Sequence, residues 1–163
     1  MNYIYIGRIV NTHGIKGELR ILSDFEKKER VFLPGIEIFI GQEKIKEVVK
    51  TYRHHKEYEM ITLEGYSNIN DVLKYKGKLV YVKREILKLK EEEYLYSDLI
   101  GLFIIENEKT LGKIKEIVYN KANILLEIEG KKSFYIPLHS NFIKKVDLEN
   151  KKVFVEGGKD LIL

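Results

Sequence analysis

The sequence predicts an all-β protein made of two small β-barrels in tandem, joined by a short charged linker, with one or two short helices. Short runs rich in β-branched and aromatic residues recur along the 163 residues, and turns separate them. The segment EILKLKEEE interrupts this pattern, because it is highly charged and has no turn glycine. We therefore assign residues 1–84 to the first barrel, 85–93 to the linker and 94–163 to the second barrel.

A hairpin is predicted at the start of the first barrel, in GRIVNTHGIKGELRI (residues 7–21). Its first strand begins near Tyr3, and beyond the loop apolar and charged residues alternate. Gly14 and Gly17 lie three apart in the loop, as a bulged hairpin turn requires. Two interpretations of the loop stay open. Either the glycines only form the turn, or they bring backbone N–H groups and Lys16 to a phosphate.

The rest of the first barrel contains further strands and one helix. The polar segment 23–35 has room for one helical turn before a Pro-Gly turn. The helix is predicted at residues 67–77, where Ser67 or Asn68 can cap its start and Gly77 can end it. The strands are expected at residues 36–41, 42–55, 57–65 and 78–84.

The second barrel is predicted to consist almost entirely of strands. One helical turn is expected in EYLYSDLIG, just before the first of them. Short strands at regular spacing are typical of small barrels and sandwiches. They are expected at residues 101–107, 111–120, 123–130, 132–137, 144–147 and 152–156.

Composition limits the classes of function. The chain has 29 Lys and Arg residues against 25 Asp and Glu, and this net charge of +4 suits an RNA or a protein partner. Because cysteine is absent, disulfides and thiolate metal sites are excluded, and a reducing cytosol fits. The N-terminus lacks the pattern of a signal peptide, and no apolar run approaches the roughly 18 residues that span a bilayer. We therefore expect a cytoplasmic protein with no membrane segment.

The sequence motifs of common enzymes are missing. The chain has no Gly-x-Ser-x-Gly, no cysteine nucleophile, no phosphate loop and no spaced acid cluster for a two-metal nuclease. His54 and His55 are adjacent in a predicted strand and therefore point to opposite faces, so they are poorly placed to share a metal ion, even with His13 and His139 as distant helpers. We predict a protein that is not an enzyme and uses no metal or cofactor.

Three stretches together resemble the ribosome maturation factor RimM family. They are the hairpin at 7–21, the segment TYRHHKEYEMITLEGYSNINDVLKYKG (51–77), and EEYLYSDLIG followed by residues 111–118 and 136–156. A Gly-x-x-Leu-type tail, Gly158 to Leu161, ends the match. The stretches follow the order of the family over nearly the whole chain. The resemblance implies an N-terminal RimM-type β-barrel and a C-terminal PRC-barrel.

The resemblance also implies a function. A member of this family would be a non-catalytic, chaperone-like accessory factor that binds the immature small (30S) ribosomal subunit. It would support maturation of the head and 16S rRNA processing, and it would contact small-subunit ribosomal protein nineteen as a monomer. The alternative from another class is a general RNA-binding β-barrel module without a dedicated ribosomal protein partner.

Tyr94, Leu95 and Tyr96 are the predicted contacts for the ribosomal protein. The family commonly has Tyr-Tyr-Trp before its Asp-Leu-Ile-Gly, so two of these three positions keep an aromatic character. Aromatic side chains are enriched at interface anchors, because a rigid ring buries a large area at small entropic cost. The competing interpretation is that these side chains fill the end of the second barrel.

Cationic residues in both barrels are the predicted contacts for rRNA. A salt bridge to Glu18 or to a neighbouring strand is the competing role for Arg20, and protection of an edge strand is the competing role for the lysine pair in the second barrel. The candidates are Arg8, His13, Lys16, Arg20, His55, Lys144 and Lys145.

Overall fold

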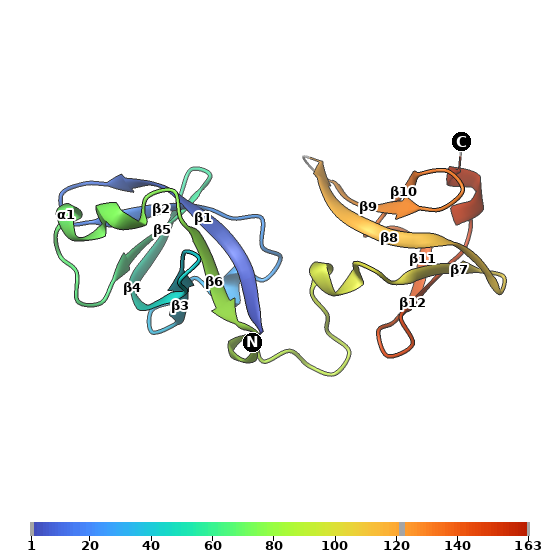
Figure 1. Ribbon diagram of the computed structural model, residues 1–163, viewed down its shortest axis with the longest axis horizontal. Coiled ribbons are helices and arrows are strands. Elements are labelled where there is room, and N and C mark those ends of the chain that lie inside the picture. The colour runs from blue at the N-terminus through green and yellow to red at the C-terminus, as the bar shows by residue number, and fades with distance from the viewer. Residues whose placement is uncertain (1, 121–122, 163) are drawn as a thin grey trace. The chain divides into compact units, whose positions relative to one another are not determined.

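Strands dominate both halves of the chain. The structure is a computed structural model that describes residues 2–120 and 123–162, in which the chain forms twelve β-strands, one α-helix and five 3₁₀ turns. The chain divides into two compact units between Glu91 and Glu92. The predicted all-β chain with two small barrels in tandem is thereby confirmed (Figure 1).

The first unit is a closed six-stranded barrel with the order β1-β2-β5-β4-β3-β6 (Figure 1). Every neighbouring pair in it is antiparallel. Alternate residues of β2 and β5 face inward and are fully buried, because side chains on a strand alternate between two faces. The strands are β1 (Tyr3–His13), β2 (Glu18–Leu22), β3 (Glu37–Ile40), β4 (Ile45–His55), β5 (Tyr58–Leu63) and β6 (Leu79–Lys83).

The predicted helix is present but changes type after one turn. Helix α1 (Ile69–Val72) begins after Asn68, whose side chain accepts a hydrogen bond of 2.8 Å from the backbone N–H of Asn70. The chain then continues as the 3₁₀ turn η2 (Leu73–Tyr75). The Tyr75 hydroxyl donates to Glu47 on β4, so a tertiary contact holds this end of the helical segment.

Part of the predicted linker belongs to the first unit. The 3₁₀ turn η3 (Arg84–Leu87) follows β6, and the Leu87 side chain is buried. Arg30 reaches from the turn η1 (Lys28–Arg30) and donates to the backbone carbonyl of Leu87 over 3.0 Å. The segment 85–87 is therefore part of the folded first unit. The Leu87 side chain is buried, and the Leu87 carbonyl accepts a hydrogen bond from Arg30.

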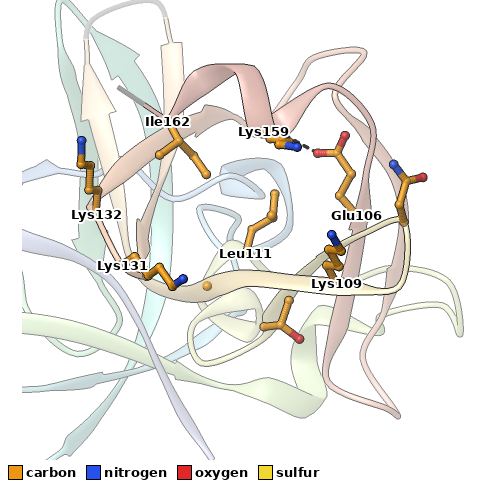
Figure 2. A pocket seen from close by; sticks show the side chains of 11 residues that line it. Glu106, Lys109, Leu111, Lys131, Lys132, Lys159 and Ile162 are labelled. Carbon is orange, nitrogen blue, oxygen red and sulfur yellow. Dashed lines mark hydrogen bonds between the residues drawn. The ribbon is translucent and has the colours of Figure 1, made fainter.

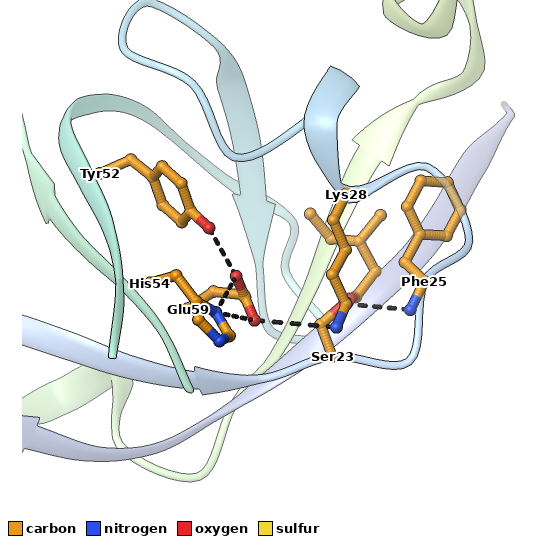
Figure 3. A network of polar contacts seen from close by, with 7 residues as sticks. Ser23, Phe25, Lys28, Tyr52, His54 and Glu59 are labelled. Carbon is orange, nitrogen blue, oxygen red and sulfur yellow. Dashed lines mark hydrogen bonds and ion pairs between the residues drawn. The ribbon is translucent and has the colours of Figure 1, made fainter. Parts of the chain in front are cut away.

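A buried carboxylate connects the barrel wall to the segment between β2 and β3. Glu59 is only 2% exposed, and it accepts a hydrogen bond of 2.6 Å from the Tyr52 hydroxyl. His54 Nδ1 lies 3.0 Å from the same carboxylate, and Lys28 Nζ lies 3.7 Å from it (Figure 3). A buried charge requires such partners, because desolvation without them is costly. The carboxylate thus links β4, β5 and the η1 segment.

This arrangement predicts a loss of stability in alkali. Burial, followed by the hydrogen bond to Glu59, raises the pKa of Tyr52 from 10.0 to about 12. The folded protein therefore keeps a proton that the unfolded chain releases, and the free energy of unfolding should fall as the pH rises through this window. Urea titrations followed by NMR signals of residues 2–91 should show a shallower fall for Tyr52→Phe than for the wild type. An equal change in Tyr81→Phe would contradict the assignment to Tyr52.

The second unit is one six-stranded sheet with the order β10-β9-β8-β7-β12-β11 (Figure 1). The pairing of β12 with β7 is parallel, whereas the other neighbours are antiparallel. Apolar residues from all six strands meet in one core, so the sheet curls around it. The strands are β7 (Phe103–Glu106), β8 (Lys109–Asn120), β9 (Asn123–Glu129), β10 (Phe134–Pro137), β11 (Ile143–Asp147) and β12 (Lys152–Val155).

Two 3₁₀ turns flank this sheet in sequence. The turn η4 (Tyr96–Leu99) precedes β7 and contains the buried Leu99, where one helical turn is predicted. The turn η5 (Gly158–Leu161) follows β12. Among the helical segments of the described residues, none is long and apolar enough to cross a membrane.

Candidate nucleic-acid interface

A cluster of cationic side chains lies on the outer face of the first barrel. Arg20 on β2 and Arg53 on β4 are both paired in register with Met60 on β5, the strand between them. Met60 points outward, yet it is fully buried. We infer that the long arginine side chains cover it, since their apolar stems pack on the sheet while the charged ends reach water.

Hydrogen bonds hold this cluster in place. Arg53 donates from Nε and Nη2 to the two carboxylate oxygens of Glu18, each over 2.8 Å. Arg20 Nη2 lies 2.7 Å from His13 Nδ1, and its guanidinium lies 5.5 Å from the ring centroid of Tyr58. The hydrogen bond with Arg53 lowers the pKa of Glu18 most, so this carboxylate stays ionised and paired.

His55 lies in the positive field of the same cluster. Its pKa is lowered, first by desolvation and then by the charges of Arg53, Lys56, His13 and Arg20. A bound anion would neutralise part of this field and so favour the protonated imidazole. The cluster could meet a phosphate through the Arg20 guanidinium and the His55 imidazole, whereas Nε and Nη2 of Arg53 are paired with Glu18.

The structure brings together some of the predicted rRNA contacts and separates others. His13 and Arg20 lie within hydrogen-bond distance of each other, and the pKa of His55 is lowered first by desolvation and then by charges that include both of theirs. Arg8 lies elsewhere on β1, where its charge acts on Tyr5. Lys16 is exposed in the β1–β2 loop, beside Ile15, which is 82% exposed.

The β1–β2 loop itself is a well-fixed turn. Gly14 and Gly17 have φ values of +76° and +86°, which favour glycine. A Cβ at Gly17 would lie 3.1 Å from the carbonyl oxygen of Asn68, and Ile69 donates to the Ile15 carbonyl over 2.9 Å. Both glycines are therefore explained by the geometry of the turn, and Lys16 is the group of this loop that remains a candidate for phosphate contact.

Arg53 and Tyr58 belong to the cluster but are not among the contacts that the sequence predicts for rRNA. Arg53 shares a face with His55, two residues further along β4, and that spacing is a usable signal in the sequence. Tyr58 follows at the start of β5 and is paired in register with His55. The pairing of β2 with β5 could not be read from the spacing, because these strands are far apart in the chain.

Lys144 and Lys145 lie on β11, which is the last strand in the order of the second sheet. Lys144 Nζ lies 3.8 Å from a carboxylate oxygen of Glu156. An edge strand that carries lysines is protected from pairing with another chain. This position supports the edge-protection role for the pair, which belongs to the second unit.

The three residues predicted to contact a ribosomal protein differ in exposure. Leu95 is 0% exposed, so its side chain is part of the interior and the prediction of a surface contact is wrong for it. Tyr94 and Tyr96 are only partly buried and pack against the core of the second unit. The Tyr96 hydroxyl lies 2.8 Å from His139 Nε2, and burial raises the pKa of Tyr94. In the sequence, a partly buried tyrosine therefore stands on each side of a fully buried leucine.

The histidines are not arranged as metal ligands. His54 contacts Glu59, whereas His55 belongs to the cationic cluster, so the two adjacent side chains have different neighbours. Across residues 2–120 and 123–162, no three His, Asp or Glu side chains are grouped so that they could hold a metal ion.

Comparison with known proteins identifies the family. Residues 4–87 match the RimM N-terminal domain, and residues 96–161 match the RimM PRC barrel domain. The ribosome maturation factor RimM of Staphylococcus aureus (strain NCTC 8325 / PS 47) is 38% identical over 164 residues, which cover 98% of this chain and 98% of that protein. The protein of the same name from Staphylococcus haemolyticus (strain JCSC1435) is 37% identical with the same coverage.

Solved structures are also similar to the chain, and one of them covers its N-terminal half. The solution structure of the N-terminal domain of RimM from Thermus thermophilus covers 53% of this chain and 95% of that chain, with 17% identity and a TM-score of 0.46. The resemblance noted in the sequence is confirmed by the matches to both halves of the chain and by the full-length relatives. The chain belongs to the RimM family of ribosome maturation factors.

Proposed function

We propose that this protein is a non-catalytic accessory factor that binds the immature small (30S) ribosomal subunit and supports maturation of its head and 16S rRNA processing. The observation that carries the proposal is the cationic cluster of His13, Arg20, Arg53 and His55 on the first barrel. Phosphate contacts from arginine position a protein on nucleic acid without requiring a particular base sequence. Family membership supports a role in ribosome maturation.

The two units would contribute different contacts. The cluster on the first barrel would bind rRNA phosphates, with Lys16 and Arg8 as further contacts of the same unit. In the second unit, Tyr94 and Tyr96 would contact small-subunit ribosomal protein nineteen. Arg53 can bind a phosphate although it is paired with Glu18. A phosphate that replaces the Glu18 carboxylate keeps the guanidinium charge compensated.

The mechanism would depend on different affinities for two states of the subunit. A factor that binds the immature head more tightly than the mature head shifts the population towards a productive arrangement and then dissociates. In this proposal the protein acts in the cytoplasm as a monomer and needs no cofactor.

Co-sedimentation with purified immature and mature small subunits tests the proposal. Replacing both arginines of the cluster, Arg20→Gln with Arg53→Gln, should weaken binding to immature subunits by about tenfold, because two phosphate contacts are lost. The matched control is Lys44→Gln with Lys46→Gln, which removes the same charge around the other end of β4 and should change binding little.

Two outcomes would overturn the proposal. Equal binding of the wild type to mature and immature subunits would exclude the assembly mechanism. Equal weakening by the arginine pair and by the lysine control would show that net charge alone matters. A general RNA-binding module is the alternative, and it predicts that binding collapses steeply as the salt concentration rises, because phosphate contacts release counterions.

A further inference from the structure

The second unit contains a groove that the proposed function does not use. It has a volume of about 720 Å³, within the range of typical ligand sites. Three segments that are separate in sequence form it: the region around the β7–β8 turn, the β9–β10 turn and the end of the chain around η5. Figure 2 shows Lys131 and Lys132 on one side of the groove, Glu106 and Lys109 on another, and Leu111 between them.

Four lysines from these segments line the groove, namely Lys109, Lys131, Lys132 and Lys159. All four are exposed, and no carboxylate of the described residues lies within 4.0 Å of any of their ammonium groups. Elsewhere in the same unit, lysines on β8 and β11 have glutamate partners at 4.0 Å and 3.8 Å. Within residues 2–120 and 123–162, the groove therefore gathers four lysines whose ammonium groups have no carboxylate partner at this distance.

Glu106 is the acidic residue of the lining, and its carboxylate is already used. It accepts hydrogen bonds from the backbone N–H groups of Gly157 over 3.0 Å and of Lys159 over 2.9 Å. These bonds hold the chain around η5 to the end of β7. Both carboxylate oxygens have N–H donors, so Glu106 is held in the wall of the groove. Its negative charge offsets part of the positive charge of the four lysines, and the lining keeps an excess of positive charge.

The groove also has an aliphatic lining. Leu111 and Ile162 line it and are half-buried, because they pack against the core of the second unit. Among the described residues that line the groove there is no aromatic side chain. Recognition of single-stranded RNA usually relies on bases stacked on aromatic rings, which this lining does not provide. An aliphatic side chain of a polypeptide fits this surface better than a base does.

We propose that this groove binds an acidic segment of a partner polypeptide that carries an aliphatic side chain. The carboxylates of the segment would lie against the four lysines, and its aliphatic side chain would cover Leu111 and Ile162. Complementary charge would select the partner, whereas the apolar contact would add affinity that salt does not screen. The proposal does not depend on rRNA contact by the first barrel or on the two tyrosines.

Fluorescence anisotropy with the full-length protein tests this proposal. The probe is a short fluorescein-labelled peptide in which glutamate and leucine alternate, and a second peptide has serine at every leucine position. Reversing two lysines of the groove, Lys131→Glu with Lys132→Glu, should weaken binding of the leucine peptide on the order of tenfold. The control pair Lys144→Glu with Lys145→Glu makes the same change of charge on β11 and should leave binding nearly unchanged.

The lining is tested separately by Ile162→Ser. This variant should reduce the preference for the leucine peptide over the serine peptide. The substitution at Ile162 and the change from leucine to serine in the peptide each remove one side of the same apolar contact. Equal affinity of the wild type for both peptides would overturn the proposal, and so would equal effects of the two lysine pairs. Displacement of the peptide by single-stranded RNA, with the same dependence on Lys131 and Lys132, would instead assign the groove to nucleic acid.

Discussion

Alanine in place of Leu95 is expected to lower the free energy of unfolding by about 2–5 kcal/mol, the usual cost of removing a buried leucine side chain. Leu95 is completely buried, so the substitution removes its apolar contacts and leaves a cavity. Urea unfolding followed by NMR signals of residues 92–120 and 123–162 measures this loss in the second unit.

The control for Leu95 is Leu148→Ala, which deletes the same atoms at a position that is 36% exposed. This control should lower the free energy of unfolding by less than Leu95→Ala does, because Leu148 already exposes part of its side chain to water. An equally small effect of Leu95→Ala would show that this leucine is available at the surface after all, and it would restore Leu95 as a candidate for partner contact.

If Tyr94 and Tyr96 contact small-subunit ribosomal protein nineteen, as we propose, replacing both by alanine should weaken that binding by about thirtyfold, the effect of losing an aromatic anchor worth about 2 kcal/mol. Both rings are only partly buried, so they can still present surface to a partner. Binding of purified protein nineteen to the wild type and to the double variant measures the effect, with circular dichroism as the check on folding.

Two other tyrosines of the second unit provide the control for this experiment. Tyr119 and Tyr135 are 47% and 48% exposed, and replacing both by alanine removes the same chemical groups at other positions. Binding should be nearly unchanged in this control. Unchanged binding in the Tyr94 and Tyr96 variant, with an intact fold, would assign both rings to the core and would remove the main support for the protein contact.

The elements that depend on local patterns were predictable from the sequence. Alternation of apolar and charged residues located strand β2, because a half-buried strand has a period of two. The cap at Asn68 and the positive φ at Gly77 set the limits of the short helical segment, because both depend on a few neighbouring atoms. The family was also identifiable, since its motifs follow one another along the chain.

Burial of individual residues at the ends of elements was not predictable. The sequence offers Tyr94, Leu95 and Tyr96 as three similar apolar candidates, and only packing decides that the leucine is interior. The buried Glu59 is a similar case. Its spacing in β5 places it on the inward face, but its partners come from β4 and from the η1 segment.

The sequence by itself determined the tandem all-β architecture, the turns and the family, because strand periodicity, glycine conformation and motif order are properties of the chain over short distances. Only the tertiary structure decided which charges meet. Arg20 and Arg53 come together because the barrel pairs β2 and β4 with the same strand, and the four lysines of the groove come from three segments that meet only when the second sheet curls. Such long-range pairings are set by the way each sheet wraps around its core, and no local pattern encodes them.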